Sequence, residues 1–441
     1  MNPSNRKNRS RLLPVRGLYF ADFIVLMVIL FGTLTIRFGS NWPKSFATYL
    51  LGFLIATFIH IIVFYFGELY EPSPRLGARL WLPRVSALTT IAILIDATLA
   101  LITGYFLMPR GNLIAFAVLS SLGVTFNRWL SRKVRTKRFG KPRVLLAGQK
   151  SDLELGREHL LASEPHVICA GSTETFESLS ETINELNATD VLLMSAGGLE
   201  MIYPSPLAEL ESKRVGVFQR VVPSDTLLGF KRSRQIAGMP FIALKAHSLS
   251  PSRANFKRLI ETTYILIAAL PFAFLTFMVA IYIRSIVGEK IIYRQERVGK
   301  FGETFMMMKF RTMPLNAEEK TGVIKADKED YRILRGLGWI RKSRLDELPQ
   351  IINVIRGEMS IIGPRPERPD FTKDYEKLIP GYGRRHDIPP GITGLAQVDG
   401  RYHTDPRYKL GHDLQYLVNW SPILDLQILL KTIWIVLSQR L

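Results

Sequence analysis

The sequence predicts a membrane protein of the α plus α/β class. We expect an N-terminal four-helix transmembrane bundle, a small Rossmann-like parallel α/β domain, and a C-terminal mixed α/β module with a re-entrant membrane helix. Three observations indicate this class. Apolar residues make up 47% of the 441 residues, although the formal net charge is +20. Four apolar runs near the ~20 residues of a spanning helix come first. Strand-like and helix-like segments then alternate, as in a parallel α/β layer.

The composition limits the class of protein and the compartment. High apolar content with strong positive charge is typical of a membrane protein with basic cytoplasmic faces. We therefore expect no nucleic acid as a partner. The single cysteine, Cys169, excludes an internal disulfide framework and fits a reducing compartment. We interpret it as a small core residue rather than a nucleophile.

The predicted bundle covers residues 1–138. Its apolar runs are 17–36, 48–67, 86–107 and 113–130. Residues 1–16 are basic and lack a cleavage pattern, which predicts a cytoplasmic tail. Basic residues gather in this tail, after the second run and after the fourth, so the positive-inside rule places both ends of the bundle in the cytoplasm. Asp96, inside the third run, is either a functional carboxylate or an interhelical hydrogen-bond partner.

The Rossmann-like domain is predicted at residues 139–225. Strand-like segments at 143–148, 166–171 and 190–194 alternate with helix-like segments at 152–162 and 174–187. The turn after the first strand does not fit G-x-G-x-x-G, so we expect no nicotinamide cofactor and favour a regulatory or assembly role. Residues 226–256 are predicted to be a basic connector.

A re-entrant helix hairpin is predicted at residues 257–288. Its apolar run, 264–283, has basic residues on both flanks, and a spanning helix would leave one of these clusters on the far side. Pro271 interrupts the backbone ladder in mid-run and serves as a structural hinge. The alternative is an ordinary fifth crossing with a proline kink. That alternative would place the chain beyond it outside the cell.

The predicted catalytic module, residues 289–441, contains two adjacent carboxylates at a helix start. Pro349 is tolerated only near a first helical turn, which places Asp346 and Glu347 at or just before it. Gly357 is the predicted stop, and the isoleucines supply the apolar face. These are Ile351, Ile352 and Ile355. We expect one carboxylate to attack a phosphorus atom and the other to hold a cation. The alternative is a capping box, Ser343-x-x-Asp346, with no chemistry.

Phosphate chemistry also needs cations around the nucleophile. The candidates are Arg294, Arg297, Lys309, Arg311, Arg341 and Arg365. Arginine suits phosphate oxygens, and Pro364 and Pro366 would hold Arg365 rigidly. A divalent ion, Mg²⁺, would offset the charge of a diphosphate. Residues 316–330 are highly charged and form either a solvated helix or a mobile cover. Residues 421–437 are predicted to be an amphipathic helix lying on the surface.

Six motifs then resemble the bacterial sugar transferases. These are the monotopic phosphoglycosyl transferases, or polyprenyl-phosphate hexose-1-phosphate transferases. The motifs are Tyr293–Gly299, Lys309–Met313, Leu345–Gln350, Asn353–Ser360, Gly363–Pro366 and Gly391–Gln397. The resemblance covers residues from about 257 to 441. The front half resembles the long members, which add a transmembrane bundle and a Rossmann-like domain.

The resemblance implies a reaction and roles for residues. A UDP-sugar, usually a UDP-hexose, gives its sugar-1-phosphate to undecaprenyl phosphate and releases UMP. Asp346 would be the nucleophile and form a covalent phosphosugar intermediate. Glu347 would help bind Mg²⁺, and Arg365 would grip phosphate. We assign the neutral Gln397, together with the cations named above, to substrate binding.

The family also implies a location and a pathway step. We expect a multi-pass protein of the bacterial inner membrane, with the catalytic domain on the cytoplasmic face, which starts exopolysaccharide, capsule or O-antigen synthesis. A homodimer is expected from the likeness to the long members. The alternatives are a non-catalytic membrane scaffold of polysaccharide assembly, in which Asp346 is only a cap, and a lipid-linked sugar transporter. The bundle offers no evident translocation path for the latter.

Overall fold

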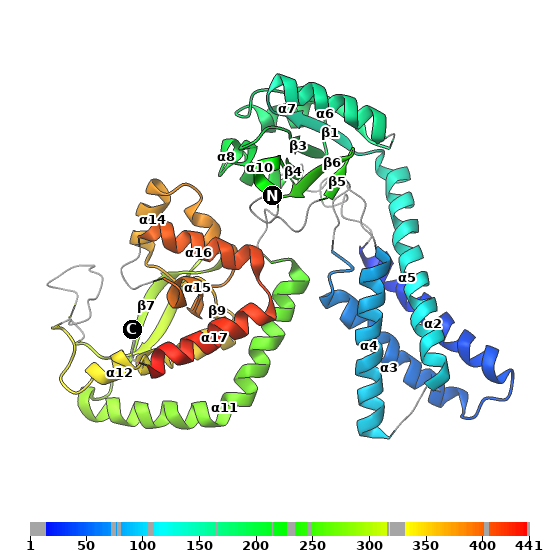
Figure 1. Ribbon diagram of the computed structural model, residues 1–441. Helices are drawn as coiled ribbons and strands as arrows, with labels where there is room; N and C mark the ends of the chain where they lie inside the picture. Colours follow the sequence, from blue (N-terminus) through cyan, green and yellow to red (C-terminus); the bar gives the residue numbers. More distant parts are fainter. Residues whose placement is uncertain are drawn as a thin grey trace. The chain divides into compact units, whose positions relative to one another are not determined.

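The computed structural model describes residues 15–71, 76, 81–104, 110–164, 166–213, 215–226, 234–244, 249–314, 317, 331–400 and 405–438. The chain divides into two compact units, Met1–Ala246 and His247–Leu441 (Figure 1). Two predicted features fall outside the described residues. They are the cytoplasmic tail, apart from its last two residues, and the charged segment 316–330, apart from Ala317.

Four long apolar helices open the first unit and confirm the predicted bundle. They are α2 (Val15–Phe38), α3 (Phe46–Phe66), α4 (Trp81–Thr103) and α5 (Arg110–Phe139). Each contains a segment long and apolar enough to cross a membrane. α5 continues beyond the predicted end at residue 130, because its basic last turns prolong the same helix past the apolar part.

Buried polar contacts join the bundle helices. The Asp22 carboxylate accepts a 2.9 Å hydrogen bond from the Tyr70 hydroxyl and forms an ion pair with Arg128. On α4, Asp96 Oδ2 lies 3.5 Å from Nδ1 of His60 on α3. Of the two interpretations of Asp96, the structure therefore favours the interhelical partner.

A six-stranded sheet with apolar clusters on both faces completes the first unit. Its strands are β1 (Arg143–Ala147), β2 (Ile168–Thr173), β3 (Asp190–Leu193), β4 (Gly216–Arg220), β5 (Arg234–Ile236) and β6 (Met239–Ala243). The helices are α6 (Lys150–Ser163), α7 (Leu179–Glu185), α8 (Gly198–Ile202), α9 (Leu207–Ser212) and α10 (Pro223–Thr226). In the order β2-β1-β3-β4-β6-β5, the first four strands are parallel. Leu145 packs on one face and Leu146 on the other. The predicted α/β layer is confirmed.

The last two strands lie within the predicted connector, 226–256. β5 and β6 pair in antiparallel fashion, and β6 extends the sheet from β4. Between them, Ala237 and Gly238 have φ angles of 51° and 74°. Two residues with positive φ make the hairpin turn whose twist suits paired strands. Ala-Gly is not among the dipeptides that signal this turn, so the sequence contains no clear hairpin signal here.

The second unit begins with α11 (Pro251–Val287), one long helix where the sequence predicted a hairpin. Ser250 caps it by accepting from the Arg253 N–H, and Pro251 occupies the first turn. Pro271 lies inside the helix, and Figure 1 shows α11 bent midway along its length. Only 6% of the most apolar 18-residue stretch of α11 is buried inside the protein, and Leu270 is 85% exposed.

Both ends of α11 pack on the same module. Near its start, Arg258 donates a hydrogen bond to Val354 O. Near its end, the Tyr282 hydroxyl donates to Gly336 O at 3.0 Å, and Ile283 is fully buried. The exposed apolar middle of α11 is therefore flanked by two anchors on one body.

The module itself is mixed α/β, as predicted. A hairpin of β7 (Ile292–Val298) and β8 (Thr304–Phe310) turns at η2 (Lys300–Gly302), and β9 (Ser360–Ile362) pairs in parallel with β10 (Gly391–Thr393). The helical elements are α12 (Gly338–Lys342), η3 (Leu345–Glu347), α13 (Gln350–Arg356), α14 (Pro369–Leu378), η4 (Tyr382–Asp387), α15 (Leu395–Val398), α16 (Pro406–Asn419) and α17 (Pro422–Leu437). The helix predicted at residues 421–437 is confirmed as α17, which buries Ile428 against the module and exposes Trp434.

Candidate active site

The turn that holds Asp346 and Glu347 is bounded by two special backbone positions. Arg344 adopts a left-handed conformation, with φ of 62°, which ends α12 and starts the 3₁₀ turn η3. Pro349 then stands at the N-cap of α13, and Gly357 closes that helix with φ of 83°. The predicted helix start and stop are therefore confirmed. The two carboxylates lie on the tight turn just before α13.

The predicted apolar face of α13 is wrong. Ile352 and Ile355 are 40% and 59% exposed, and Ile351 is only partly buried. The buried side instead carries Gln350, Val354 and Asn353, and Asn353 is fully buried. Its Oδ1 accepts from Met308 N at 3.0 Å, and its Nδ2 donates to Met306 O at 2.9 Å. A side-chain amide thus fastens α13 to β8, which a search for apolar residues does not detect.

Three cationic side chains surround the Glu347 carboxylate. Oε1 lies 2.8 Å from Lys309 Nζ, 2.9 Å from Arg365 Nη2 and 3.3 Å from Arg344 Nη1. Burial by itself would raise the pKa of Glu347, but Lys309, Arg365 and Arg344 together hold the pKa well below its usual range. Glu347 is therefore ionised, and all three cationic side chains contact its Oε1 atom.

Asp346 has the opposite environment. Its side chain is buried, and within the described part of the chain Oδ1 has no hydrogen-bond partner. Burial, and next the charge of Glu347, raise the pKa of Asp346 from 3.8 to about 6, although Lys309 and Arg341 offset part of that rise. The group is thus a desolvated carboxylate with a free oxygen, which is what a nucleophile requires.

The other predicted site residues divide into two sets. Arg297 lies close to Arg365, donates to Pro366 O at 3.2 Å, and has its pKa lowered to about 10 by burial and then by Arg365. Arg341, on α12, acts electrostatically on Asp346. Lys309, Arg365 and Arg341 thus act on the carboxylates, and Arg297 lies beside Arg365.

The second set has other partners or is exposed. Arg311 donates to Val287 O and so fastens the end of α11. Arg294 is exposed on β7. Gln397 donates from Nε2 to Ile392 O at 3.1 Å, and its buried Oε1 has no partner among the described residues. Among the described residues, neither Arg311 nor Arg294 is seen to contact the turn that holds the two carboxylates.

Sequence reasoning missed two arginines. Arg344 was not selected, although it contacts Glu347. Arg385, buried on η4, donates from Nη2 to Arg365 O at 3.0 Å and pairs with Asp413 on α16 at 2.8 Å. Burial on its own would lower the pKa of Arg385. The charge of Asp413, with smaller contributions from other neighbours, outweighs this effect, so the net shift of the pKa is upward. Arg385 therefore fixes the backbone carbonyl of Arg365. No local pattern marks either residue.

The carboxylates also allow a test for magnesium. Among the described residues there is no group of three or more His, Cys, Asp or Glu side chains that could hold a metal ion. Mg²⁺, however, typically takes one or two protein carboxylates and completes its shell with water and substrate phosphate oxygens. Two adjacent carboxylates, one with an unpartnered buried oxygen, fit that use. The residues therefore suit a magnesium ion shared with a phosphate substrate.

These features define a class before any comparison: two buried carboxylates among cationic side chains, a combination that suits phosphate chemistry, beside a long apolar helix. The sequence model of the bacterial sugar transferase family matches residues 252–439. The chain is 36% identical over 178 residues to the uncharacterized sugar transferase EpsL of Bacillus subtilis, which covers 40% of this chain and 85% of that protein. This protein belongs to the bacterial sugar transferase family.

Two further relatives have specific names. A UDP-glucose:undecaprenyl-phosphate glucose-1-phosphate transferase of Caulobacter vibrioides is 36% identical over 182 residues, which is 40% of this chain and 68% of the relative. A protein of the same name from Xanthomonas campestris pv. campestris is 37% identical over 217 residues, which is 47% of this chain and 44% of the relative. The match thus spans less than half the length of the Xanthomonas protein.

Proposed function

We propose that this protein transfers a sugar-1-phosphate from a UDP-sugar to undecaprenyl phosphate and releases UMP. The observation that carries the proposal is the buried turn in which a free Asp346 oxygen lies beside Glu347 and its three cations. The names of the relatives from Caulobacter and Xanthomonas support the substrate class. This reaction commits a sugar to a lipid carrier and so initiates polysaccharide synthesis.

The first step forms a covalent intermediate. The Asp346 carboxylate oxygen attacks the phosphorus that bears the sugar, and the bond from that phosphorus to the bridging oxygen breaks. UMP leaves with the bridging oxygen and its electron pair. Asp346 then holds the sugar-1-phosphate as an acyl phosphate. The raised pKa of about 6 leaves most Asp346 ionised at neutral pH, and burial removes the water that would blunt its attack.

The second step restores the enzyme. A phosphate oxygen of undecaprenyl phosphate attacks the same phosphorus, and the bond from phosphorus to Asp346 breaks. The product is a sugar diphosphate lipid, and the carboxylate is free again. Arg365 and Lys309 lie where they can stabilise charge on the transferring phosphoryl group in both steps. Glu347 would hold Mg²⁺, which supplies charge neutralisation for the diphosphate when bound.

The membrane arrangement follows from α11. Since both of its ends pack on one module and its apolar middle is exposed, we propose that it enters one leaflet and returns. A lipid phosphate at the membrane surface can then meet a soluble nucleotide at Asp346. We place this module on the cytoplasmic face of the bacterial inner membrane, where basic residues are retained.

Release of UMP tests the proposal. The purified full chain, given undecaprenyl phosphate and a panel of UDP-sugars, is expected to release UMP with at least one donor and to lose that activity when EDTA removes divalent ions. Adding Mg²⁺ back is expected to restore it. If no donor in the panel yields UMP, the scaffold alternative is favoured and the enzyme proposal is wrong.

The activity is expected to fall in acid. Because the pKa of Asp346 is raised to about 6, the attacking carboxylate becomes protonated as the pH falls through that value. The kcat/KM for the donor should then drop about tenfold per pH unit below it. Initial rates between pH 5 and 8, on protein shown to remain folded, measure this limb. A flat profile down to pH 5 would contradict a nucleophile with a raised pKa.

A further inference from the structure

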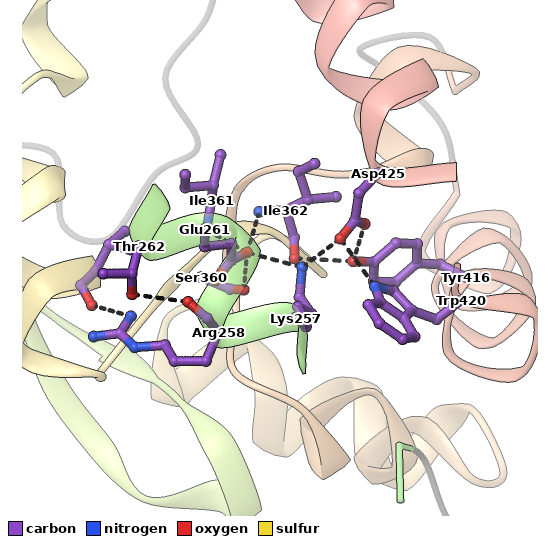
Figure 2. Close-up of polar contacts among 11 residues, drawn as sticks. Lys257, Arg258, Glu261, Thr262, Ser360, Ile361, Ile362, Tyr416, Trp420 and Asp425 are labelled. Atoms are coloured by element: carbon purple, nitrogen blue, oxygen red, sulfur yellow. Dashed lines mark hydrogen bonds and ion pairs between the residues drawn. The ribbon is translucent and has the colours of Figure 1, made fainter. Parts of the chain in front are cut away.

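The first turns of α11 contact both segments that build the site. Arg258 donates from Nη1 to Val354 O and, at 2.9 Å, from Nη2 to Ile355 O, two carbonyls in the last turn of α13. α13 is the helix that follows the Asp346–Glu347 turn. One turn further along α11, Glu261 reaches β9, the strand that leads to Arg365 (Figure 2).

Glu261 is buried, and one of its oxygens receives several donors from β9. Oε1 accepts from Ser360 Oγ at 2.5 Å, from Ile361 N at 3.0 Å and from Ile362 N at 3.4 Å. Charged acceptors make stronger hydrogen bonds than neutral ones. A carboxylate from the membrane helix therefore holds all three residues of a very short strand (Figure 2).

The Glu261 carboxylate is itself held in place. Lys257 Nζ lies 2.8 Å from Glu261 Oε1 and 3.1 Å from Asp425 Oδ2, so it bridges α11 and α17. Asp425 also accepts from the Tyr416 hydroxyl at 2.7 Å and from Trp420 Nε1 at 2.9 Å. All five side chains are buried. A buried network in which each charge is paired and hydrogen-bonded permits little movement of its members.

Only Gly363 and Pro364 separate β9 from Arg365. Gly363 donates to Thr393 O and packs so closely against Pro389 and Gly391 that there is no space for a side chain. Proline fixes the backbone on each side of Arg365. Any displacement of β9 must therefore move the Arg365 guanidinium relative to Glu347, from which it is 2.9 Å away.

We propose that Glu261 is a positioning residue for the proposed transfer reaction, on which this inference rests. By holding β9, it sets Arg365 against Glu347 and links that geometry to the part of α11 that leads into the membrane. Glu261 touches no reacting atom, and it acts through Arg365. Its effect on the reaction must therefore depend on the presence of Arg365.

A double-mutant cycle tests this dependence. Glu261→Gln keeps the shape but replaces a charged acceptor with an amide that cannot satisfy the same donors. We expect it to lower kcat/KM for the UDP-sugar about 10- to 100-fold, and to weaken UDP binding measured by calorimetry. In an Arg365→Lys background, which removes the fixed fork but keeps the charge, the same change is expected to cost less than about threefold. Thr263→Val is the matched control, since the Thr263 hydroxyl donates within α11, to Leu259 O.

The outcomes separate the alternatives. Equal losses from Glu261→Gln in both backgrounds, or no loss in either, would overturn the positioning role, because a purely structural residue adds its cost independently of Arg365. If Glu261→Gln does not fold, Ser360→Ala removes one donor to Glu261 and is expected to show the same dependence at about threefold to tenfold. If the unmodified chain releases no UMP, the proposed function fails, and the cycle on UDP binding alone decides the positioning role.

Discussion

Asp346→Asn is expected to abolish transfer, with a loss of UMP release of about 10⁴-fold or more. An amide of the same shape fills the same buried space, but it has no carboxylate oxygen to attack phosphorus. Because the charged form of Asp346 is disfavoured by burial, its folded pKa is raised, so any stabilising contribution is confined to acid and lost as pH rises through about 6. At neutral pH the variant should therefore melt no lower than the wild type, which excludes unfolding as the cause.

Mass spectrometry identifies the attacking residue directly. Incubated with donor alone, the wild-type chain is expected to gain one sugar-1-phosphate on the peptide that contains Asp346. Asp346→Asn should gain none. Asp370→Asn, which changes an exposed aspartate in the first turn of α14, should gain the same mass as wild type. An adduct on another residue, or UMP release by Asp346→Asn near the wild-type rate, would refute the covalent route.

The parts of the site that could be predicted are those fixed by local backbone chemistry. Pro349 and Gly357 mark the ends of α13 because one lacks an N–H and the other tolerates positive φ. The apolar runs predicted the bundle because a spanning helix needs a set length. The motif around Asp346 and Glu347 was recognisable for the same reason: its residues are neighbours in the chain.

The parts that could not be predicted depend on distant partners. Glu261 and Ser360 are 99 residues apart, and Lys257 and Asp425 are 168 apart. Without structure, Lys257 is only a basic flank of an apolar run. The buried face of α13 was mispredicted because Asn353 forms hydrogen bonds with backbone groups of β8. Hydrogen bonds from a helix to a strand elsewhere in the chain have no local sequence signature. Both cases involve buried polar residues, whose positions are set by what they pair with.

Glu347→Gln is expected to lower kcat/KM about 10²- to 10³-fold, and its sharper test is the pH profile. The Glu347 charge holds Lys309, Arg344 and Arg365 at one point, so its loss lets the cations repel one another. The same charge is the second cause of the raised pKa of Asp346, after burial. Neutralising it should lower that pKa, and the acid limb of the remaining activity should move to lower pH.

The shift together with the Mg²⁺ requirement distinguishes a role in the site from general damage. A variant that merely loosens the fold would lose activity at every pH, and where it exposed Asp346 it would also lower the pKa of that carboxyl, but its Mg²⁺ requirement would stay unchanged. With Glu347 as the metal-holding carboxylate, more Mg²⁺ should be needed to reach half of the residual rate. Glu303→Gln, at an exposed glutamate before β8, is the matched control and should keep the wild-type limb. An acid limb that moves upward in Glu347→Gln would mean that the two carboxylates do not interact as their positions require.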